Sequence, residues 1–264
     1  MPRANRHYIP GCVWHITHRC HKQEFLLKFN KDKKRWRHWL FVAKKRYGLC
    51  VLNFIATSNH IHLLVVDTGV DVISKSLQLV AGRTAQEYNI RKKRKGAFWE
   101  DRYHATAIQS DEHLAKCMVY IDLNMVRAGV VKHPSEYNPS GYNEIQNPPK
   151  RCRIINPKAN LDYFSMGDER KFQQAHHAWV EEELRNDKLQ RNRLWSEAIA
   201  IGNEDFVEDF HSQLKEKNTA GKKVTCACMT VLKEPRSAYN TLFGGKKVAL
   251  SHKNTYYIEL TDGN

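Results

Sequence analysis

The chain has 264 residues, of which 41% are hydrophobic, so it is long enough for one large domain or for one domain with an extension. No apolar run approaches the roughly 20 residues that a membrane-spanning helix needs, and the first residues lack the apolar core of a secretory signal, so we expect a cytoplasmic protein without a membrane partner. The net charge of +15 is concentrated in residues 1–150, where 25 Lys and Arg stand against 12 Asp and Glu, and it indicates a polyanionic partner, most simply nucleic acid.

The first half of the chain alternates between strand patterns and helix patterns. Apolar runs and alternation predict strands at 13–19, 50–56, 60–66 and 103–109, and helical spacing predicts helices at 32–47, 71–89 and from Ser110 or Asp111 to Gly129. We expect Asp32 to cap the first of these helices. The first six elements have the βαββαβ order of a ferredoxin-like α+β sandwich with an antiparallel sheet, in which the first and third strands are central. The last helix is an addition to that fold.

Two histidines lie in the third predicted strand. His60 and His62 are two residues apart, so their side chains lie on one face of the strand, while Ile61 and Leu63 lie on the other. Two neighbouring imidazoles can bind one metal ion. The alternative is a pair of hydrogen-bonded structural histidines.

The helix that follows the fourth strand has a polar band with an aromatic residue in it. At about 100° per residue, His113, Lys116, Tyr120, Asn124 and Arg127 share this band. If the helix lies over the sheet, Asn124 can add an oxygen ligand to the two histidines. Such an open site suits Mg²⁺ or Mn²⁺, and a tyrosine oxygen beside it can attack a phosphate. The alternative for Tyr120 is a half-buried helix tyrosine.

Three motifs in this half resemble those of one family. NHIHLL (residues 59–64), FWEDRY (98–103) and YIDLNMVRAGVV (120–131) are similar, in this order, to motifs of the REP-associated tyrosine transposases, bacterial relatives of the single-tyrosine HUH transposases. The opening YIPGCVWHIT (8–17) is also similar to theirs. The resemblance covers roughly residues 1–135. Asp122, which is often histidine in these proteins, can tune the site.

The resemblance implies a function in DNA strand transfer. His60 and His62 would be metal ligands, with Asn124 as the third, and Tyr120 would attack a DNA phosphodiester to give a 5′-phosphotyrosine and a free 3′-hydroxyl. The implied substrate is single-stranded DNA with short palindromic hairpins, the REP elements. The protein would cleave and rejoin this DNA, as a monomer or a homodimer.

Basic side chains of the first helix, of the run at 91–95 and beside the aromatic FWEDRY motif are our candidates for DNA contacts, from their charge alone. They are Lys33, Lys34, Arg35, Arg37, Lys44, Lys45, Arg46, Arg91, Lys92, Lys93, Arg94, Lys95 and Arg102. Phe98, Trp99 and Tyr103 can stack on unpaired bases or pack beneath the loop.

Residues 139–150 are rich in Pro, Asn and Gly and predict the end of a nuclease domain at about residue 150. We expect residues 151–264 to be a mainly helical extension that binds the DNA hairpin or docks on the first domain. Residues 161–191 predict a charged helix with a surface pair, His176 and His177. Short helices are expected at 194–201 and 204–214, as a docked helical hairpin or a helix-turn-helix.

Two other functions are compatible with parts of this pattern. A hairpin-DNA-binding regulatory protein that does not cut DNA would keep the basic residues but would not need Tyr120. A metal hydrolase of small phosphoesters would need neither Tyr120 nor the basic runs. The presence of His60, His62, Tyr120 and Asn124 together favours the transesterase.

Overall fold

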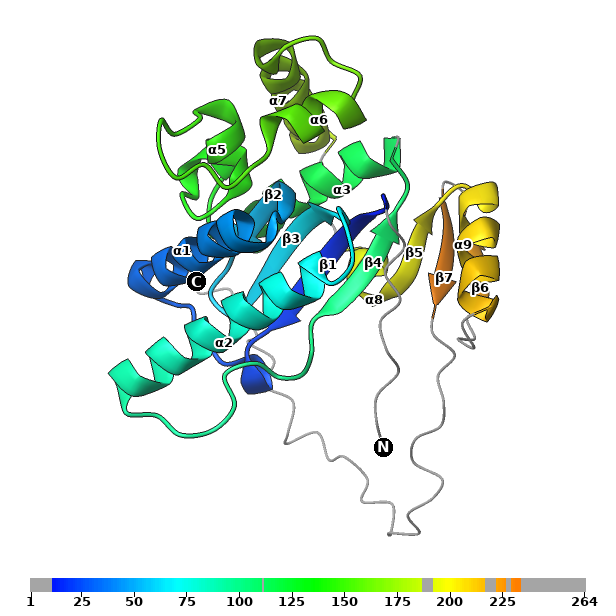
Figure 1. Ribbon diagram of the computed structural model, residues 1–264. Coiled ribbons are helices and arrows are strands. Elements are labelled where there is room, and N and C mark those ends of the chain that lie inside the picture. Colours follow the sequence, from blue (N-terminus) through cyan, green and yellow to red (C-terminus); the bar gives the residue numbers. More distant parts are fainter. Residues whose placement is uncertain (1–10, 111, 187–191, 217–221, 227–228, 234–264) are drawn as a thin grey trace, which may run out of the picture. The chain divides into compact units, whose positions relative to one another are not determined.

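A single mixed sheet organises the computed structural model, which describes residues 11–110, 112–186, 192–216, 222–226 and 229–233 (Figure 1). Its strand order is β2-β3-β1-β4-β5-β7-β6. The strands are β1 (Val13–Arg19), β2 (Cys50–Ala56), β3 (His60–Val66), β4 (His104–Ile108), β5 (Ala198–Gly202), β6 (Lys222–Cys226) and β7 (Met229–Lys233). All neighbouring pairs are antiparallel except β4 with β5, which are parallel.

The predicted ferredoxin-like sandwich is confirmed in the first four strands. β1 pairs with β3 on one side and with β4 on the other, and β3 also pairs with β2. The first and third strands are therefore central, as the βαββαβ order requires. A tight turn at residues 57–59 joins β2 and β3, and in it the Thr57 hydroxyl donates to the carbonyl oxygen of His60.

The long helices α1 (Asn30–Tyr47) and α2 (Val72–Lys92) lie side by side across one face of this sheet (Figure 1). Trp36 of α1 contacts Phe54 of β2, with ring centroids 6.1 Å apart. The preceding residue of β2, Asn53, donates a hydrogen bond to the carbonyl oxygen of Met118, which belongs to the helix at Glu112–Asp122. Successive side chains of a strand alternate between faces, so α1 and the helix of Met118 cover opposite faces of the sheet.

Both long helices differ from their predicted limits. Asp32 is not the cap of α1 but lies inside it, where it is buried and forms an ion pair with Arg91. α2 continues to Lys92, so Arg91 and Lys92 are helical rather than part of a loop. Both differences have the same cause, because Asp32 of α1 pairs with Arg91 of α2. Local sequence spacing does not reveal this contact between two helices.

The predicted helix from residue 110 to Gly129 is two helices, α3 (Glu112–Asp122) and α4 (Asn124–Arg127). Leu123 separates them, with φ −79° and ψ 4°, outside the α-helical values. Asp111 lies outside the described residues. Helical hydrogen bonds nevertheless continue across Leu123, from its N–H to the carbonyl oxygen of Val119 and from Arg127 N–H to the carbonyl oxygen of Leu123.

The remaining described helices are shorter or lie after residue 130. They are the 3₁₀ helices η1 (His21–Gln23) and η2 (Pro134–Glu136), and α5 (Gly141–Gln146), α6 (Pro157–Tyr163), α7 (Glu169–Arg185), α8 (Leu194–Glu197) and α9 (Glu204–Glu216). The helix expected at 204–214 is confirmed as α9.

The helix expected at 194–201 is wrong beyond Glu197. Ala198–Gly202 forms β5, which pairs with the edge of β4 through Ala107↔Ala200 and Ile108↔Ile201. The backbone groups of this segment form hydrogen bonds with the open edge of β4 instead of the internal hydrogen bonds of a helix. A helix-turn-helix at this place is therefore excluded, and the region predicted as mainly helical also supplies strands β5, β6 and β7.

By contacts, the chain divides into a unit at 1–234 and a unit at 235–264. The sheet of the first unit thus contains strands from both sides of residue 150, while the boundary at 150 between a nuclease segment and an extension stays a prediction. The Gly-Gly-Lys-Lys run at 244–247, whose sequence is typical of a β-turn, lies outside the described residues. Within the described part of the chain, no helix has the length and hydropathy needed to cross a bilayer.

Candidate active site

His60 and His62 lie on the face of β3 that α3 covers, and they line one pocket with residues of β1, η1, α3, α4 and α8. The antiparallel register places Thr17 opposite His62 and Arg19 opposite His60, so these four side chains share a face. The lining residues are Thr17, Arg19, Gln23, Asn59, His60, His62, Tyr120, Asn124, Arg127, Ala128 and Ser196. The pocket therefore brings together all four residues that the sequence analysis placed in the reaction.

His62 is held by a second histidine that the sequence analysis did not single out. His15 Nδ1 lies 2.8 Å from the carbonyl oxygen of Trp195, and His15 Nε2 lies 2.8 Å from His62 Nδ1. The carbonyl can only accept, so His15 Nδ1–H donates to it and His62 Nδ1–H donates to His15 Nε2. This assignment of protons from the hydrogen-bond network leaves the lone pair of His62 on Nε2, on the pocket side.

Burial keeps both rings of this relay neutral. Desolvation is the largest cause that lowers the pKa of His15 to about 3, against a smaller opposing effect of its hydrogen bond to Trp195. Burial, followed by the neighbouring His60 and His15, holds the pKa of His62 well below its ordinary value. Neutral imidazole is the form that binds a metal ion.

His60 is oriented from the turn before it. Its Nδ1 lies 2.7 Å from Oδ1 of Asn59 and 3.0 Å from Oγ1 of Thr57. An amide oxygen only accepts, so Nδ1 carries the proton and the lone pair lies on Nε2. The NHIHLL motif thus fixes one imidazole through its own asparagine and the other through His15.

Tyr120 is almost fully buried among rings and beneath a guanidinium. Its ring centroid lies 5.9 Å from that of His62 and 5.9 Å from that of Trp195. The Arg127 guanidinium carbon lies 4.1 Å from the centroid, and its Nη2 donates to the carbonyl oxygen of Tyr120.

Asn124 completes a donor set for a divalent ion. Its Nδ2 lies 3.1 Å from His62 Nε2, so the amide already reaches the lone pair of this histidine. A half-turn of the amide brings Oδ1 to the same place. Two imidazole nitrogens and an amide oxygen then face one pocket, which fits the Mg²⁺ or Mn²⁺ that the sequence analysis expects.

The candidate DNA contacts on α1 lie on the opposite face of the sheet, and several have partners within the protein. Lys33 is buried above the Tyr137 ring, and Lys44 donates to the carbonyl oxygens of Arg153 and Ile155. The ion pairs of the other candidates are Arg35–Glu87, Arg37–Glu144, Arg91–Asp32 and Arg94–Glu24. Lys34, Lys45, Arg46, Lys92, Lys93, Lys95 and Arg102 are exposed. DNA contact by any of the candidates stays a prediction.

The aromatic residues beside Arg102 pack inside the protein. Phe98 is buried, and the Trp99 ring stacks on His18 with centroids 4.1 Å apart while its Nε1 donates to the carbonyl oxygen of Ala81. Packing beneath the loop therefore fits these two rings better than base stacking.

A buried polar network holds the C-terminal end of α3. Asp122 accepts from Asn53 at 3.0 Å, and its other oxygen lies 2.7 Å from Nε2 of His176. The interpretation of His176 and His177 as a surface pair is wrong for His176, which is fully buried, whereas the His177 side chain is 52% exposed. Asp122 thus acts on the site through the position of α3.

Sequence reasoning missed His15, Arg19 and the α8 segment. Alternation along β1 does place His15, Thr17 and Arg19 on one face, so strand register could have found the first two. No local signal connects Trp195 or Ser196 to the site, since their approach depends on the pairing of β5 with β4.

A family model matches the segment of the chain that carries most of this site. Residues 8–124 match the model of the family described as "Transposase IS200 like". The family resemblance predicted from the motifs is confirmed at this level, and the matched segment contains His60, His62, Tyr120 and Asn124. No curated protein matches the chain.

Two solved structures are similar to the chain. One is a REP-associated tyrosine transposase bound to a REP hairpin, with a TM-score of 0.46, 19% identity, and coverage of 64% of this chain and 98% of the other. The second is described as a transposase of Deinococcus radiodurans R1, with a TM-score of 0.33, 15% identity, and coverage of 49% and 98%.

Proposed function

We propose that the protein, whose residues 8–124 match the IS200-like transposase model, is a metal-dependent single-stranded DNA transesterase. The Tyr120 oxygen attacks a phosphodiester of hairpin-bearing DNA. The new oxygen–phosphorus bond forms as the bond to the 3′ oxygen breaks, and the phenol proton passes through solvent to that oxygen. The products are a 5′-phosphotyrosine and a free 3′-hydroxyl, whose return attack rejoins DNA and restores the tyrosine.

One observation carries this proposal. His60, His62, Tyr120 and Asn124 come from positions up to 64 residues apart, yet they line one pocket. The motifs at 59–64 and 120–131 are the basis for the narrower substrate, a REP-type hairpin. Tyr120 is buried beneath Arg127 rather than exposed on the helix surface, which supports a function for this tyrosine within the pocket.

The chain's own residues have separate tasks in this reaction. His60, His62 and Asn124 hold the divalent ion, which when bound polarises a phosphate oxygen. Arg19 and Arg127 line the same pocket and supply positive charge for the phosphate. Arg127 also fixes the plane of the Tyr120 ring. His15 keeps His62 in the tautomer with its lone pair on Nε2.

Cleavage of labelled single-stranded hairpin DNA tests the proposal. We expect strand cleavage by the wild type in Mg²⁺ or Mn²⁺, and its loss in EDTA and in His60→Ala. DNA affinity should change little in His60→Ala, because the imidazole acts through the ion. Cleavage that persists in EDTA would contradict the metal dependence. Tight binding without cleavage of any cognate hairpin would support the regulatory DNA-binding protein instead.

A further inference from the structure

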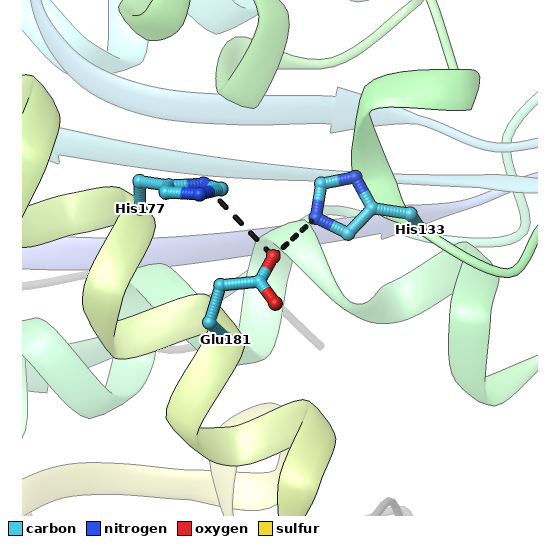
Figure 2. A group of neighbouring side chains, drawn as sticks. All are labelled: His133, His177 and Glu181. Carbon is cyan, nitrogen blue, oxygen red and sulfur yellow. Dashed lines mark hydrogen bonds and ion pairs between the residues drawn. The ribbon is translucent and has the colours of Figure 1, made fainter.

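A second group of metal-ligating side chains lies outside the active site, on α7 and on the segment that precedes η2. His177 and Glu181 are four residues apart on α7, so they project from the same side of the helix, and His133 approaches them from the other segment (Figure 2). One ligand atom from each residue lies within 4.8 Å of the others. Neither the transposase family match nor the proposed reaction uses these residues.

The separations between these atoms are close to those of a zinc site. His133 Nε2 lies 3.0 Å from Glu181 Oε1, and His177 Nδ1 lies 4.0 Å from the same oxygen. Ligands of tetrahedral Zn²⁺, with bonds of about 2.0–2.1 Å, lie roughly 3.3 Å from one another. Small side-chain rotations therefore bring the three ligands to a common centre.

Among the described residues, no lysine or arginine forms an ion pair with the Glu181 carboxylate, and the adjacent Arg185 donates through Nε to the backbone carbonyl oxygen of Glu181. In the part of the chain that the structure describes, the ion-pair partners of Glu181 are His133 and His177. Imidazole supplies a lone pair rather than a full charge at neutral pH. A divalent cation between the three side chains would supply the missing charge and accept both lone pairs.

Neighbouring groups hold both imidazoles in place. His133 Nδ1 accepts the backbone N–H of Ser135 at 3.2 Å, so Nε2 carries the proton and donates to Glu181. Zn²⁺ binding through Nε2 would move this proton to Nδ1, where the Ser135 hydroxyl, 2.6 Å away, can accept it. The Tyr142 hydroxyl lies 3.0 Å from His177 Nδ1, a hydrogen bond that metal binding through Nδ1 would replace. Metal-ligating histidines commonly have such second partners.

We propose that His133, His177 and Glu181 form a Zn²⁺ site that links α7 to the segment that precedes η2. The two imidazoles and one carboxylate leave a fourth position for water. This site lies beside a small apolar cluster in which Val180 of α7 and Tyr142 pack with Val119 and Leu123. The bound ion would therefore stabilise the packing of α7 against α3, the helix that carries Tyr120.

Equilibrium dialysis of the full chain with Zn²⁺ tests this site. Glu181→Gln and His177→Ala change exposed side chains and should preserve the fold, and we expect each to weaken Zn²⁺ binding at this site by about tenfold or more. The matched control is Glu182→Gln, an exposed neighbour on the same helix, which should bind Zn²⁺ as the wild type does. His60→Ala should also retain this site, which separates it from the proposed active-site ion.

A thermal measurement provides a second readout. Saturating Zn²⁺ should raise the Tm of the wild type and of Glu182→Gln by several degrees, and should have a smaller effect on Glu181→Gln. Equal Zn²⁺ affinity in the wild type, Glu181→Gln and His177→Ala would overturn the proposal. An equal loss in Glu182→Gln would do the same, because the effect would then not depend on the three ligands.

Discussion

His15 links the face of the sheet that carries His60 and His62 to the second part of the chain through two hydrogen bonds, one to His62 and one to the carbonyl oxygen of Trp195. Both bonds require particular tautomers, and both rings are buried. A substitution at His15 should therefore change both the packing of the site and the pH dependence of the free energy of unfolding. Because the pKa values of His15 and His62 are lowered in the folded protein, protonation of these residues should favour unfolding.

The free energy of unfolding should decrease as the pH is lowered below about 6.5, the ordinary pKa of histidine. Between that pH and about 3, the unfolded chain binds a proton at His15 that the folded chain does not. The free energy of unfolding should thus decrease by roughly 1.4 kcal/mol per pH unit for this residue alone. Urea unfolding of the wild type and of His15→Gln at pH 7.5, 6 and 5 measures this, and the variant should have the shallower dependence. Equal slopes would show that another group is responsible.

Arg127 fixes the Tyr120 ring, so its removal should slow the reaction without removing the nucleophile. We expect Arg127→Met to lower the single-turnover cleavage rate by about 100-fold, since small misplacements of reacting groups have effects of this size. Lys116→Met, an exposed change on α3 that also removes one positive charge, is the control and should cleave nearly normally. Equal rates in the two variants would reduce the Arg127 effect to one of net charge.

At the scale of elements, α3 is held at its C-terminal end by Asp122, Asn53 and His176. His176→Leu would leave a buried carboxylate oxygen without its partner and should lower the free energy of unfolding by about 1–3 kcal/mol. Gln174→Leu, an exposed change on the same helix, should have little effect. Chemical denaturation of both variants makes the comparison. Equal stability would mean that Asn53 alone satisfies Asp122.

The elements that sequence patterns predicted correctly are those with a clear apolar pattern of their own. The His60–Val66 strand, its turn and its neighbour β2 have clear apolar patterns and local turn chemistry. Residues 194–201 do not, because LWSEAIAI contains helix-forming residues and also an alternating end. The open edge of β4 decides in favour of β5, and that edge is a property of the folded sheet rather than of the segment.

The site was predictable to the same extent. Spacing placed His60 and His62 on one face, and helical geometry placed Tyr120 near Asn124. The break at Leu123 and the buried partner of His176 were not predictable, since both depend on contacts of α3 with distant residues. The motif resemblance supplied the link between the strand and the helix that periodicity alone left open.

At the scale of the whole molecule, the active site and the basic face of α1 lie on opposite sides of one sheet. The lysines that are exposed at the end of α2, Lys92, Lys93 and Lys95, are better candidates for DNA contact than their paired arginine neighbours. Their combined change to alanine should weaken binding to all single-stranded sequences and flatten its dependence on log salt by about 0.7 for each phosphate that the variant no longer binds. Fluorescence anisotropy at several salt concentrations measures both quantities.

The control for that experiment removes the same charge elsewhere. Lys150, Lys158 and Lys171 are exposed in the second part of the chain, and their change to alanine also lowers the net charge by three. If both triple variants have the same salt dependence, the end of α2 is not a specific DNA-binding surface and the effect belongs to the overall charge.

The most direct measurement of the central claim is the detection of a covalent protein–DNA adduct. Wild type and Tyr120→Phe are incubated with Mn²⁺ and with hairpin-bearing single-stranded DNA labelled on the 3′ side of the cleaved bond, and are then separated on a denaturing gel. The account predicts a labelled protein band in the wild type that is absent from Tyr120→Phe, with equal DNA binding by the two proteins. Labelled protein of equal intensity in Tyr120→Phe would contradict Tyr120 as the nucleophile, and cleavage without any adduct would contradict the transesterase itself.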